Sequence, residues 1–159
     1  MANSDLNILW HPSPNYTERE RAIDMIVIHY TEMESAAAAL ARLCDPVTEV
    51  SAHYLIDEGG QITQMVADEH CAWHAGESFW EGQTSLNHNS IGIELDNKGN
   101  EPFTEAQMQS LEHLLAALIA RHRIPPQRIV GHSDIAPGRK VDPGPFFDWG
   151  RLRQRWPIV

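Results

Sequence analysis

The sequence predicts an α/β protein with a mixed central β-sheet flanked by helices, in a single domain that covers residues 1–159. The chain has 159 residues, the usual size of one domain, and 42% of them are hydrophobic, which is enough for a packed core. Short apolar runs typical of buried strands alternate with segments of helical periodicity. Strands and helices that intermix in this way favour an α/β fold with a mixed sheet.

The first third of the chain contains one strand and one helix. Residues 1–22 are polar and rich in turn-forming residues, and we expect them to be irregular. Residues 24–30 form a short apolar, β-branched run, which predicts a buried strand. Residues 34–43 are rich in alanine, which favours a helix that ends before Asp45-Pro46.

The middle of the chain contains a hairpin and a further strand. Residues 51–57 and 61–66 are strand-like runs on either side of Gly59-Gly60, the pattern of a β-hairpin. Residues 67–89 are mixed in composition and are expected to be loop-like. Residues 90–96 alternate between apolar and other side chains, which predicts a strand. Its apolar face consists of Ile91, Ile93 and Leu95, and its other face of Gly92, Glu94 and Asp96.

The last third predicts the longest helix, a short strand and a closing helix. Thr104 and Gln107 have the spacing of a capping box, and Pro125-Pro126 stops the helix that follows. The apolar stripe of this helix is Met108, Leu111, Leu115, Leu118 and Ile119. A short strand at 127–130 leads into residues 131–145, whose Gly and Pro content argues against regular helix and interior strand. Residues 147–156 are expected to form the closing helix.

Composition excludes several classes of partner. Twelve basic and 22 acidic side chains give a net charge of −10, which argues against nucleic acid and anionic membrane. No apolar run approaches the roughly 20 residues that span a bilayer. The start of the chain has no basic and apolar leader pattern, so we expect a cytoplasmic location, with the periplasm as the alternative if a leader has been removed. Cys44 and Cys71 are expected to be free thiols, and the chain is long enough for a monomer.

Three residues from distant segments suggest a metal site. His29 ends the predicted strand at 24–30, and His132 and Asp142 lie in the stiff segment 131–145. Two histidines and one carboxylate are a common set of protein ligands for catalytic zinc. Asp134 is the rival carboxylate; we prefer Asp142 because Lys140, two residues earlier, faces the same way in an extended segment. For each histidine alone, a hydrogen bond within the fold is the competing explanation.

Further side chains suggest catalysis near such a metal. Glu94 lies on the polar strand face beside Gly92 and could accept a proton from a water, although a strand glutamate is more often exposed to solvent. Lys140 could meet negative charge that develops on a substrate, or could equally be an exposed lysine. Trp73 and His74 offer an aromatic wall and a hydrogen-bonding group, whereas His53 is expected to be packed.

These motifs together resemble the zinc-dependent N-acetylmuramoyl-L-alanine amidases of the type-2 amidase and peptidoglycan-recognition-protein superfamily. The matching segments, in the same order, are Ser13–Asn15, Ile26–Thr31, Ser51–Ile56, Ala72–Gly76, Ser90–Leu95 and Gly131–Pro145. The likeness covers nearly the whole chain and is strongest to the bacterial branch that acts in cell-wall recycling. The chain departs from some relatives at His88, where they have an aspartate after the asparagine.

The resemblance implies a function and a role for each candidate residue. His29, His132 and Asp142 would be the Zn²⁺ ligands, Glu94 the catalytic acid and base, and Lys140 the group that stabilises the tetrahedral intermediate. Tyr30, Trp73 and His74 would contact the substrate, a peptidoglycan fragment cleaved between the lactyl group of N-acetylmuramic acid and L-alanine. A non-catalytic peptidoglycan-binding module and a zinc peptidase with unrelated substrates are the alternatives. The preference for intact wall, soluble muropeptide or the anhydro form stays open, as does a bacterial or phage origin.

Overall fold

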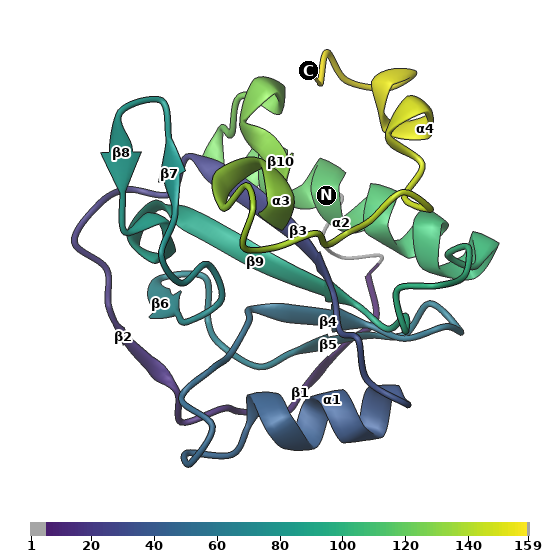
Figure 1. The fold of residues 1–159 in the computed structure, drawn as a ribbon, viewed down its shortest axis with the longest axis horizontal. Coiled ribbons are helices and arrows are strands. Elements are labelled where there is room, and N and C mark those ends of the chain that lie inside the picture. The colour runs from purple at the N-terminus through teal and green to yellow at the C-terminus, as the bar shows by residue number, and fades with distance from the viewer. Residues whose placement is uncertain (1–5, 159) are drawn as a thin grey trace.

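A computed structural model describes residues 6–158 and contains a mixed six-stranded sheet, as the sequence predicts. The strand order is β1-β5-β4-β9-β3-β10, which Figure 1 shows with helices packed around it. The strands are β1 (Ile8–Trp10), β5 (Ile62–Gln64), β4 (Tyr54–Ile56), β9 (Ser90–Leu95), β3 (Met25–Tyr30) and β10 (Ile129–Gly131). β4 and β5 are antiparallel and form the predicted hairpin, whereas every other neighbouring pair is parallel.

The central strands carry large aliphatic side chains on both faces because both faces are covered. On one face, Ile26 and Ile28 of β3 and Ile91, Ile93 and Leu95 of β9 pack into the main core. Leu111, Leu115 and Leu118 of α2 (Glu105–His122) join that core from above the sheet. Because both faces are covered, the sequence of such a buried parallel strand is a nearly continuous apolar run.

The ends of α2 follow the predicted signals. Thr104 Oγ1 accepts the Gln107 N–H at 3.1 Å and the Gln107 side chain accepts the Thr104 N–H, so the capping box is present. Gln107 also donates its side-chain N–H to the carbonyls of Ile56 and Asp96, which joins the helix to the sheet. Arg123 ends the helix in a left-handed conformation, two residues before Pro125.

The opposite face of the sheet is covered by α1 (Ala36–Leu43), by α3 (His132–Ile135) and by loops. Leu55 of β4 packs against Ala39 and Leu43 of α1, and Val27 of β3 packs against a second cluster that includes Ile135 of α3. The C-terminal helix α4 (Trp149–Arg153) is shorter than predicted and returns to α2, where Arg151 pairs with two glutamates.

Three sequence expectations are wrong. Residues 1–22 were expected to be irregular, yet β1 and β2 (Tyr16–Glu18) lie there; residues 1–5 of that range are outside the described part of the chain. Residues 67–89 contain β6 (His70–Ala72), β7 (Phe79–Trp80), β8 (Gln83–Thr84) and the 3₁₀ helix η2 (Leu86–Asn89). Residues 131–145 contain α3, and a second 3₁₀ helix, η3 (Pro126–Arg128), precedes β10. These elements are two to four residues long, so tertiary pairing such as β2 with β6 overrides weak local patterns.

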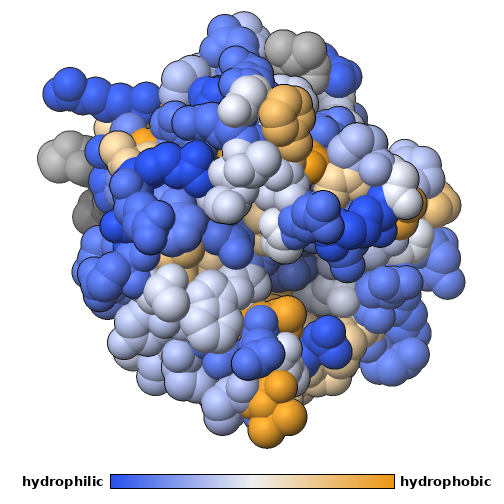
Figure 2. Space-filling view, turned by 60° about the vertical axis from the view of Figure 1, so that its left-hand side comes forward, coloured by the Kyte–Doolittle hydropathy of each residue, from blue (hydrophilic) through white to orange (hydrophobic). Residues whose placement is uncertain are grey.

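The surface agrees with the composition. The face drawn in Figure 2 is mostly hydrophilic and is hollowed near its middle, with hydrophobic patches below the hollow. Among residues 6–158, no helix is long and apolar enough to cross a membrane. Cys44 and Cys71 are both free thiols, as predicted.

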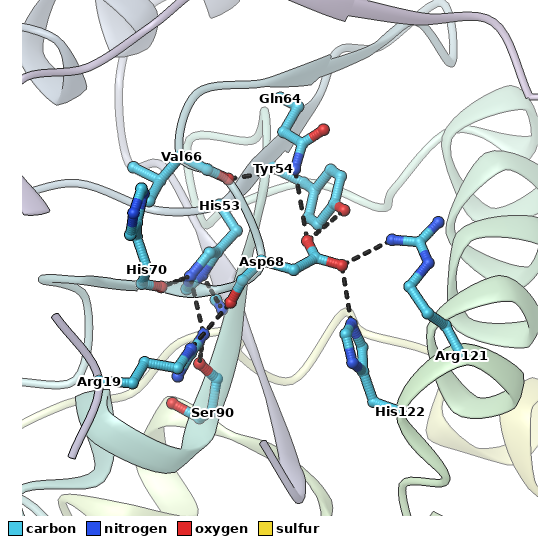
Figure 3. Close-up of polar contacts among 11 residues, drawn as sticks. Arg19, His53, Tyr54, Gln64, Val66, Asp68, His70, Ser90, Arg121 and His122 are labelled. Carbon is cyan, nitrogen blue, oxygen red and sulfur yellow. Dashed lines mark hydrogen bonds and ion pairs between the residues drawn. The ribbon is translucent and has the colours of Figure 1, made fainter. Parts of the chain in front are cut away.

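A buried carboxylate ties the hairpin to the end of α2. Asp68 accepts hydrogen bonds of 2.6 Å from Tyr54 Oη, 2.6 Å from Arg121 Nη1 and 2.7 Å from His122 Nε2 (Figure 3). Burial alone would raise the pKa of Asp68, but these hydrogen bonds outweigh it and hold the pKa below its ordinary value. The ionised carboxylate therefore stabilises the fold above the ordinary aspartate pKa of about 4.

Asp68→Asn should lower the free energy of unfolding at pH 7 by about 2 kcal/mol, a modest figure because Arg121 is partly exposed to solvent. The folded-state pKa is depressed, so this contribution is lost as pH falls from about 4 toward that lower value. Urea unfolding of both proteins at pH 7 and near pH 3 checks this, with the exposed neighbour Glu69→Gln as a matched control. An equal difference between the two proteins at both pH values would contradict the assignment.

Candidate active site

Parallel pairing brings two candidate residues side by side. His29 in β3 is the direct register partner of Glu94 in β9. On the other side of β3, Gly131 of β10 pairs with Ile28, so His132 follows at the level of His29. The carboxyl ends of parallel strands share one edge of the sheet, where α/β proteins commonly bind ligands. His29 and Glu94 point to the face opposite α2, because their neighbours Ile28 and Ile93 fill the core under that helix.

A returning segment brings Asp142 to the same place. The Ser133 N–H donates to the Asp142 carbonyl at 2.9 Å. Gly131 permits this close approach, since an added Cβ would lie 2.7 Å from Cδ of Pro143. The rival carboxylate Asp134 is engaged elsewhere, because its Oδ2 accepts the Gly131 N–H at 2.8 Å.

The three ligand atoms form a compact triangle. His29 Nδ1 lies 3.0 Å from His132 Nδ1 and 3.0 Å from Asp142 Oδ2, and His132 Nδ1 lies 3.2 Å from the same oxygen. Two ligands of a tetrahedral zinc ion, each about 2 Å from the metal, lie about 3.3 Å apart. The three residues are 2%, 5% and 6% exposed, so the triangle is shielded from bulk solvent. The donor set and its spacing therefore fit a zinc ion.

The protonation states also suit a metal. His132 Nε2 lies 3.0 Å from the Ala75 carbonyl, which can only accept, so the ring proton is on Nε2 and Nδ1 carries a lone pair. Burial lowers the pKa of His29, which favours its neutral form. Neutral imidazole and ionised carboxylate are the forms that bind metals.

The triangle lies in a cavity of about 450 Å³, within the usual size range of small-molecule sites. Glu94 lines this cavity, and its Oε2 is buried without a hydrogen-bond partner among the described residues. Burial, with the nearby Asp142 carboxylate, raises the pKa of Glu94 well above its ordinary value. Such a carboxyl group is suited to exchange a proton with a bound molecule. The lining residues predicted from sequence are His29, Tyr30, Trp73, His74, Glu94, His132, Lys140 and Asp142.

Trp73 and His74 are each held in the cavity wall by hydrogen bonds to other protein groups. Trp73 is held by two hydrogen bonds with Ser51: its N–H donates to Ser51 Oγ at 2.8 Å and its carbonyl accepts the Ser51 N–H at 2.9 Å. His74 has both ring nitrogens near protein groups, since Nδ1 is 3.0 Å from His29 Nε2 and Nε2 is 2.9 Å from Ser90 Oγ. Burial lowers the pKa of His74 well below its ordinary value, which favours a neutral ring.

Sequence reasoning missed two cations. Arg42 of α1 and Arg139 also line the cavity. Arg139 donates to the carbonyls of Ala75 and Glu77, which fixes its side chain at the rim. Arg42 lies in the last turn of a helix, where a basic residue is expected without any functional role, so the sequence contains no signal for it. The expectation that His53 is packed is confirmed, since it is fully buried.

The fold and the site define an α/β protein in which two histidines and an aspartate that could hold a metal ion lie at the carboxyl ends of the parallel strands, beside a buried glutamate. The chain belongs to the Amidase_2 family of N-acetylmuramoyl-L-alanine amidases, whose family model matches residues 19–145. The resemblance inferred from the motifs is thereby confirmed.

Curated relatives support the family. The chain is 43% identical over 155 residues to N-acetylmuramoyl-L-alanine amidase AmiD of Escherichia coli K12, covering 85% of this chain and 55% of AmiD. It is 48% identical over 103 residues to 1,6-anhydro-N-acetylmuramyl-L-alanine amidase AmpD of Haemophilus influenzae, covering 64% of this chain and 56% of AmpD. The chain thus spans about half the length of these curated relatives.

Solved structures support the fold. A selenomethionine derivative of AmpD superposes with a TM-score of 0.85 at 35% identity, covering 92% of this chain and 93% of that one. AmiD from E. coli, in complex with the substrate anhydro-N-acetylmuramic acid-L-Ala-D-gamma-Glu-L-Lys, superposes with a TM-score of 0.79 at 42% identity, covering 87% of this chain and 60% of that one. The predicted α/β fold with a mixed sheet is thereby confirmed.

Asp142→Ala should weaken zinc binding by at least about 100-fold, because it removes the one anionic ligand of the set. Competition with a chromophoric chelator measures the affinity, and Asp148→Ala, at the cap of α4, serves as a control that leaves the centre intact. Zinc at about 1,000 times the wild-type Kd should also stabilise the wild type by about 4 kcal/mol, and the same concentration should stabilise the variant by at most about 1.4 kcal/mol. Equal zinc affinity in wild type and variant would remove Asp142 from the ligand set.

Proposed function

We propose that this protein is a zinc-dependent N-acetylmuramoyl-L-alanine amidase. It hydrolyses the amide bond between the lactyl group of N-acetylmuramic acid and L-alanine in peptidoglycan fragments. The observation that carries the proposal is the convergence of His29, His132 and Asp142 beside Glu94 and Lys140 in one cavity. Family membership supports the same activity.

The residues divide the chemistry of amide hydrolysis among them. His29, His132 and Asp142 would hold the zinc ion, which would supply Lewis acidity for the hydrolysis. Glu94 accepts a proton from the attacking water and then passes it to the departing L-alanine amine. Lys140 places an ammonium group where negative charge develops on the carbonyl oxygen. Tyr30, Trp73 and His74 line the cavity and are the proposed contacts of the substrate along its wall.

Soluble anhydro-muropeptides are the proposed substrates, with a role in cell-wall recycling or degradation. The support comes from the relatives: a solved structure of AmiD is a complex with an anhydro-muramyl tripeptide as its substrate, and AmpD is named for the same anhydro sugar. The cytoplasmic location and the monomeric state remain predictions, which cell fractionation and analytical ultracentrifugation test.

The first experiment incubates the zinc-loaded protein with a defined anhydro-muramyl peptide and identifies the products by mass spectrometry. Release of a peptide that begins with L-alanine, lost on chelation and restored by zinc, supports the proposal. Binding without cleavage, in a sample shown to contain zinc, would favour a non-catalytic binding module. Cleavage of unrelated peptides would favour a general zinc peptidase.

Glu94→Gln should retain zinc and lower kcat by about 10²- to 10⁴-fold, because glutamine keeps the size of the side chain but cannot accept the proton. Steady-state kinetics with metal analysis of the same sample measures this. The exposed Glu69→Gln is the matched control and should behave as wild type. Wild-type turnover in Glu94→Gln would show that another group moves the proton.

Lys140→Ala should lower kcat by about 10²- to 10³-fold with zinc retained, the usual loss when one group that stabilises an oxyanion is removed. Lys98→Ala is a matched control, since Lys98 is exposed and pairs with the exposed Glu34. If kcat is unchanged and only KM rises, Lys140 binds substrate and takes no part in stabilising the transition state.

A further inference from the structure

A chain of hydrogen bonds leads from the candidate metal ligand His29 into the protein interior. His29 Nε2 lies 3.0 Å from His74 Nδ1, and His74 Nε2 lies 2.9 Å from Ser90 Oγ. Ser90 Oγ in turn lies 2.7 Å from the carbonyl oxygen of Leu86. In a hydrogen bond between two neutral imidazole rings, either ring can donate its N–H to the other. The groups at the far end of the chain, Ser90 and the Leu86 carbonyl, decide which ring donates.

The direction of every hydrogen bond follows from the Leu86 carbonyl. A carbonyl oxygen can only accept, so the single hydroxyl proton of Ser90 is donated to Leu86. The lone pairs of Ser90 Oγ must then accept the proton on His74 Nε2. A neutral His74 ring with its proton on Nε2 has a lone pair on Nδ1, and this lone pair accepts the N–H of His29 Nε2.

The consequence appears at the metal centre. With its proton on Nε2, His29 presents a lone pair at Nδ1, the atom 3.0 Å from both His132 Nδ1 and Asp142 Oδ2. The Ala75 carbonyl fixes His132 in the same tautomer. Three electron-pair donors thus converge with no proton between them, an arrangement that a cation stabilises.

His74 is held firmly in this position by its backbone. Asn87 Oδ1 accepts the N–H groups of His74 and Ala75, at 3.0 and 2.8 Å. The ring lies over Gly92 of β9, where an added Cβ would be 2.5 Å from His74 Cγ. Gly92 therefore provides the space that the His74 ring occupies, and a side chain there would push the ring out of the chain of hydrogen bonds.

We propose that His74 and Ser90 are positioning residues that fix His29 in the tautomer whose Nδ1 binds the metal. The inference rests on the zinc site of the proposed function. The chain ends on a neutral carbonyl, so it orients His29 without adding negative charge. Zinc bound by two neutral imidazoles and one carboxylate then keeps its net positive charge, which Lewis-acid chemistry requires.

The test compares His74→Leu with His74→Gln. Leucine removes both polar atoms, whereas the glutamine amide has an acceptor and a donor that can replace Nδ1 and Nε2. We expect His74→Leu to weaken zinc binding about 10- to 100-fold, measured by chelator competition, and His74→Gln to restore it to within a few-fold of wild type. The exposed His113→Leu on α2 is the matched control and should bind zinc as wild type does.

A second measurement identifies the tautomer of His29 directly. Long-range ¹H–¹⁵N NMR of the zinc-free wild type reports which nitrogen of His29 carries the proton, and we expect Nε2. Ser90→Ala should give a mixture of the two His29 tautomers and an intermediate zinc affinity. These results decide the matter even if His74→Leu does not fold, which circular dichroism of the zinc-free protein would show.

Three results would overturn the inference: a proton on His29 Nδ1 in the zinc-free wild type, wild-type zinc affinity in a folded His74→Leu, or equal weakening by leucine and glutamine. None of these measurements uses a substrate. A protein that binds zinc as described but leaves muropeptides intact would contradict the proposed function alone. A protein that cleaves muropeptides and keeps its zinc affinity in His74→Leu would contradict the inference alone.

Discussion

The parallel register between β3 and β9 is the constraint on which the rest of the site depends. It places His29 beside Glu94, and the pairing of β10 with the other edge of β3 places His132 one position beyond. Burial sets this register, because Ile26, Ile28 and the apolar side chains of β9 fill the core under α2. A shift of one residue would turn Glu94 toward that core and expose its apolar neighbours. The hydrophobic core therefore fixes the spacing of the polar residues on the other face.

The remaining parts of the site approach the sheet at two glycines. Gly131 leaves room for Pro143, which lets Asp142 return against His132, and Gly92 leaves room for the ring of His74. A Cβ at Gly131 would displace Pro143, the neighbour of Asp142, and a Cβ at Gly92 would displace the ring of His74, which contacts His29. The arrangement of His29, His132 and Asp142 thus depends on Gly92 and Gly131, which have no side chain that could take part in binding or catalysis.

The sequence indicated candidate site residues where strand alternation or the composition of a single loop gives a pattern. Glu94 could be placed because alternation along residues 90–96 separates its face from that of Ile93. Asp142 could be preferred to Asp134, and the structure gives Asp134 a different partner, the Gly131 N–H. The resemblance to the amidase family then assigned a role to each of these residues.

The sequence could not predict contacts between short segments that are far apart in the chain. Arg19 lies in a stretch expected to be irregular, yet it donates to the carbonyl of Asp68, which precedes β6, and to the carbonyl of Ser90, the first residue of β9 (Figure 3). Such a contact has no local pattern, since it depends on where the chain returns.

The electrostatics of the cavity differ from those of the whole molecule. The chain carries a net charge of −10, which by itself would repel a substrate that bears carboxylates. Arg42, Arg139 and Lys140 nevertheless line the cavity, where they face the acidic side chains of Glu32, Glu94 and Asp142. At physiological ionic strength, exposed charges more than about 8 Å apart are largely screened from one another. A substrate in the cavity therefore experiences these three cations more strongly than the distant acidic surface. The charge inside the cavity is therefore less negative than the net charge of the chain indicates.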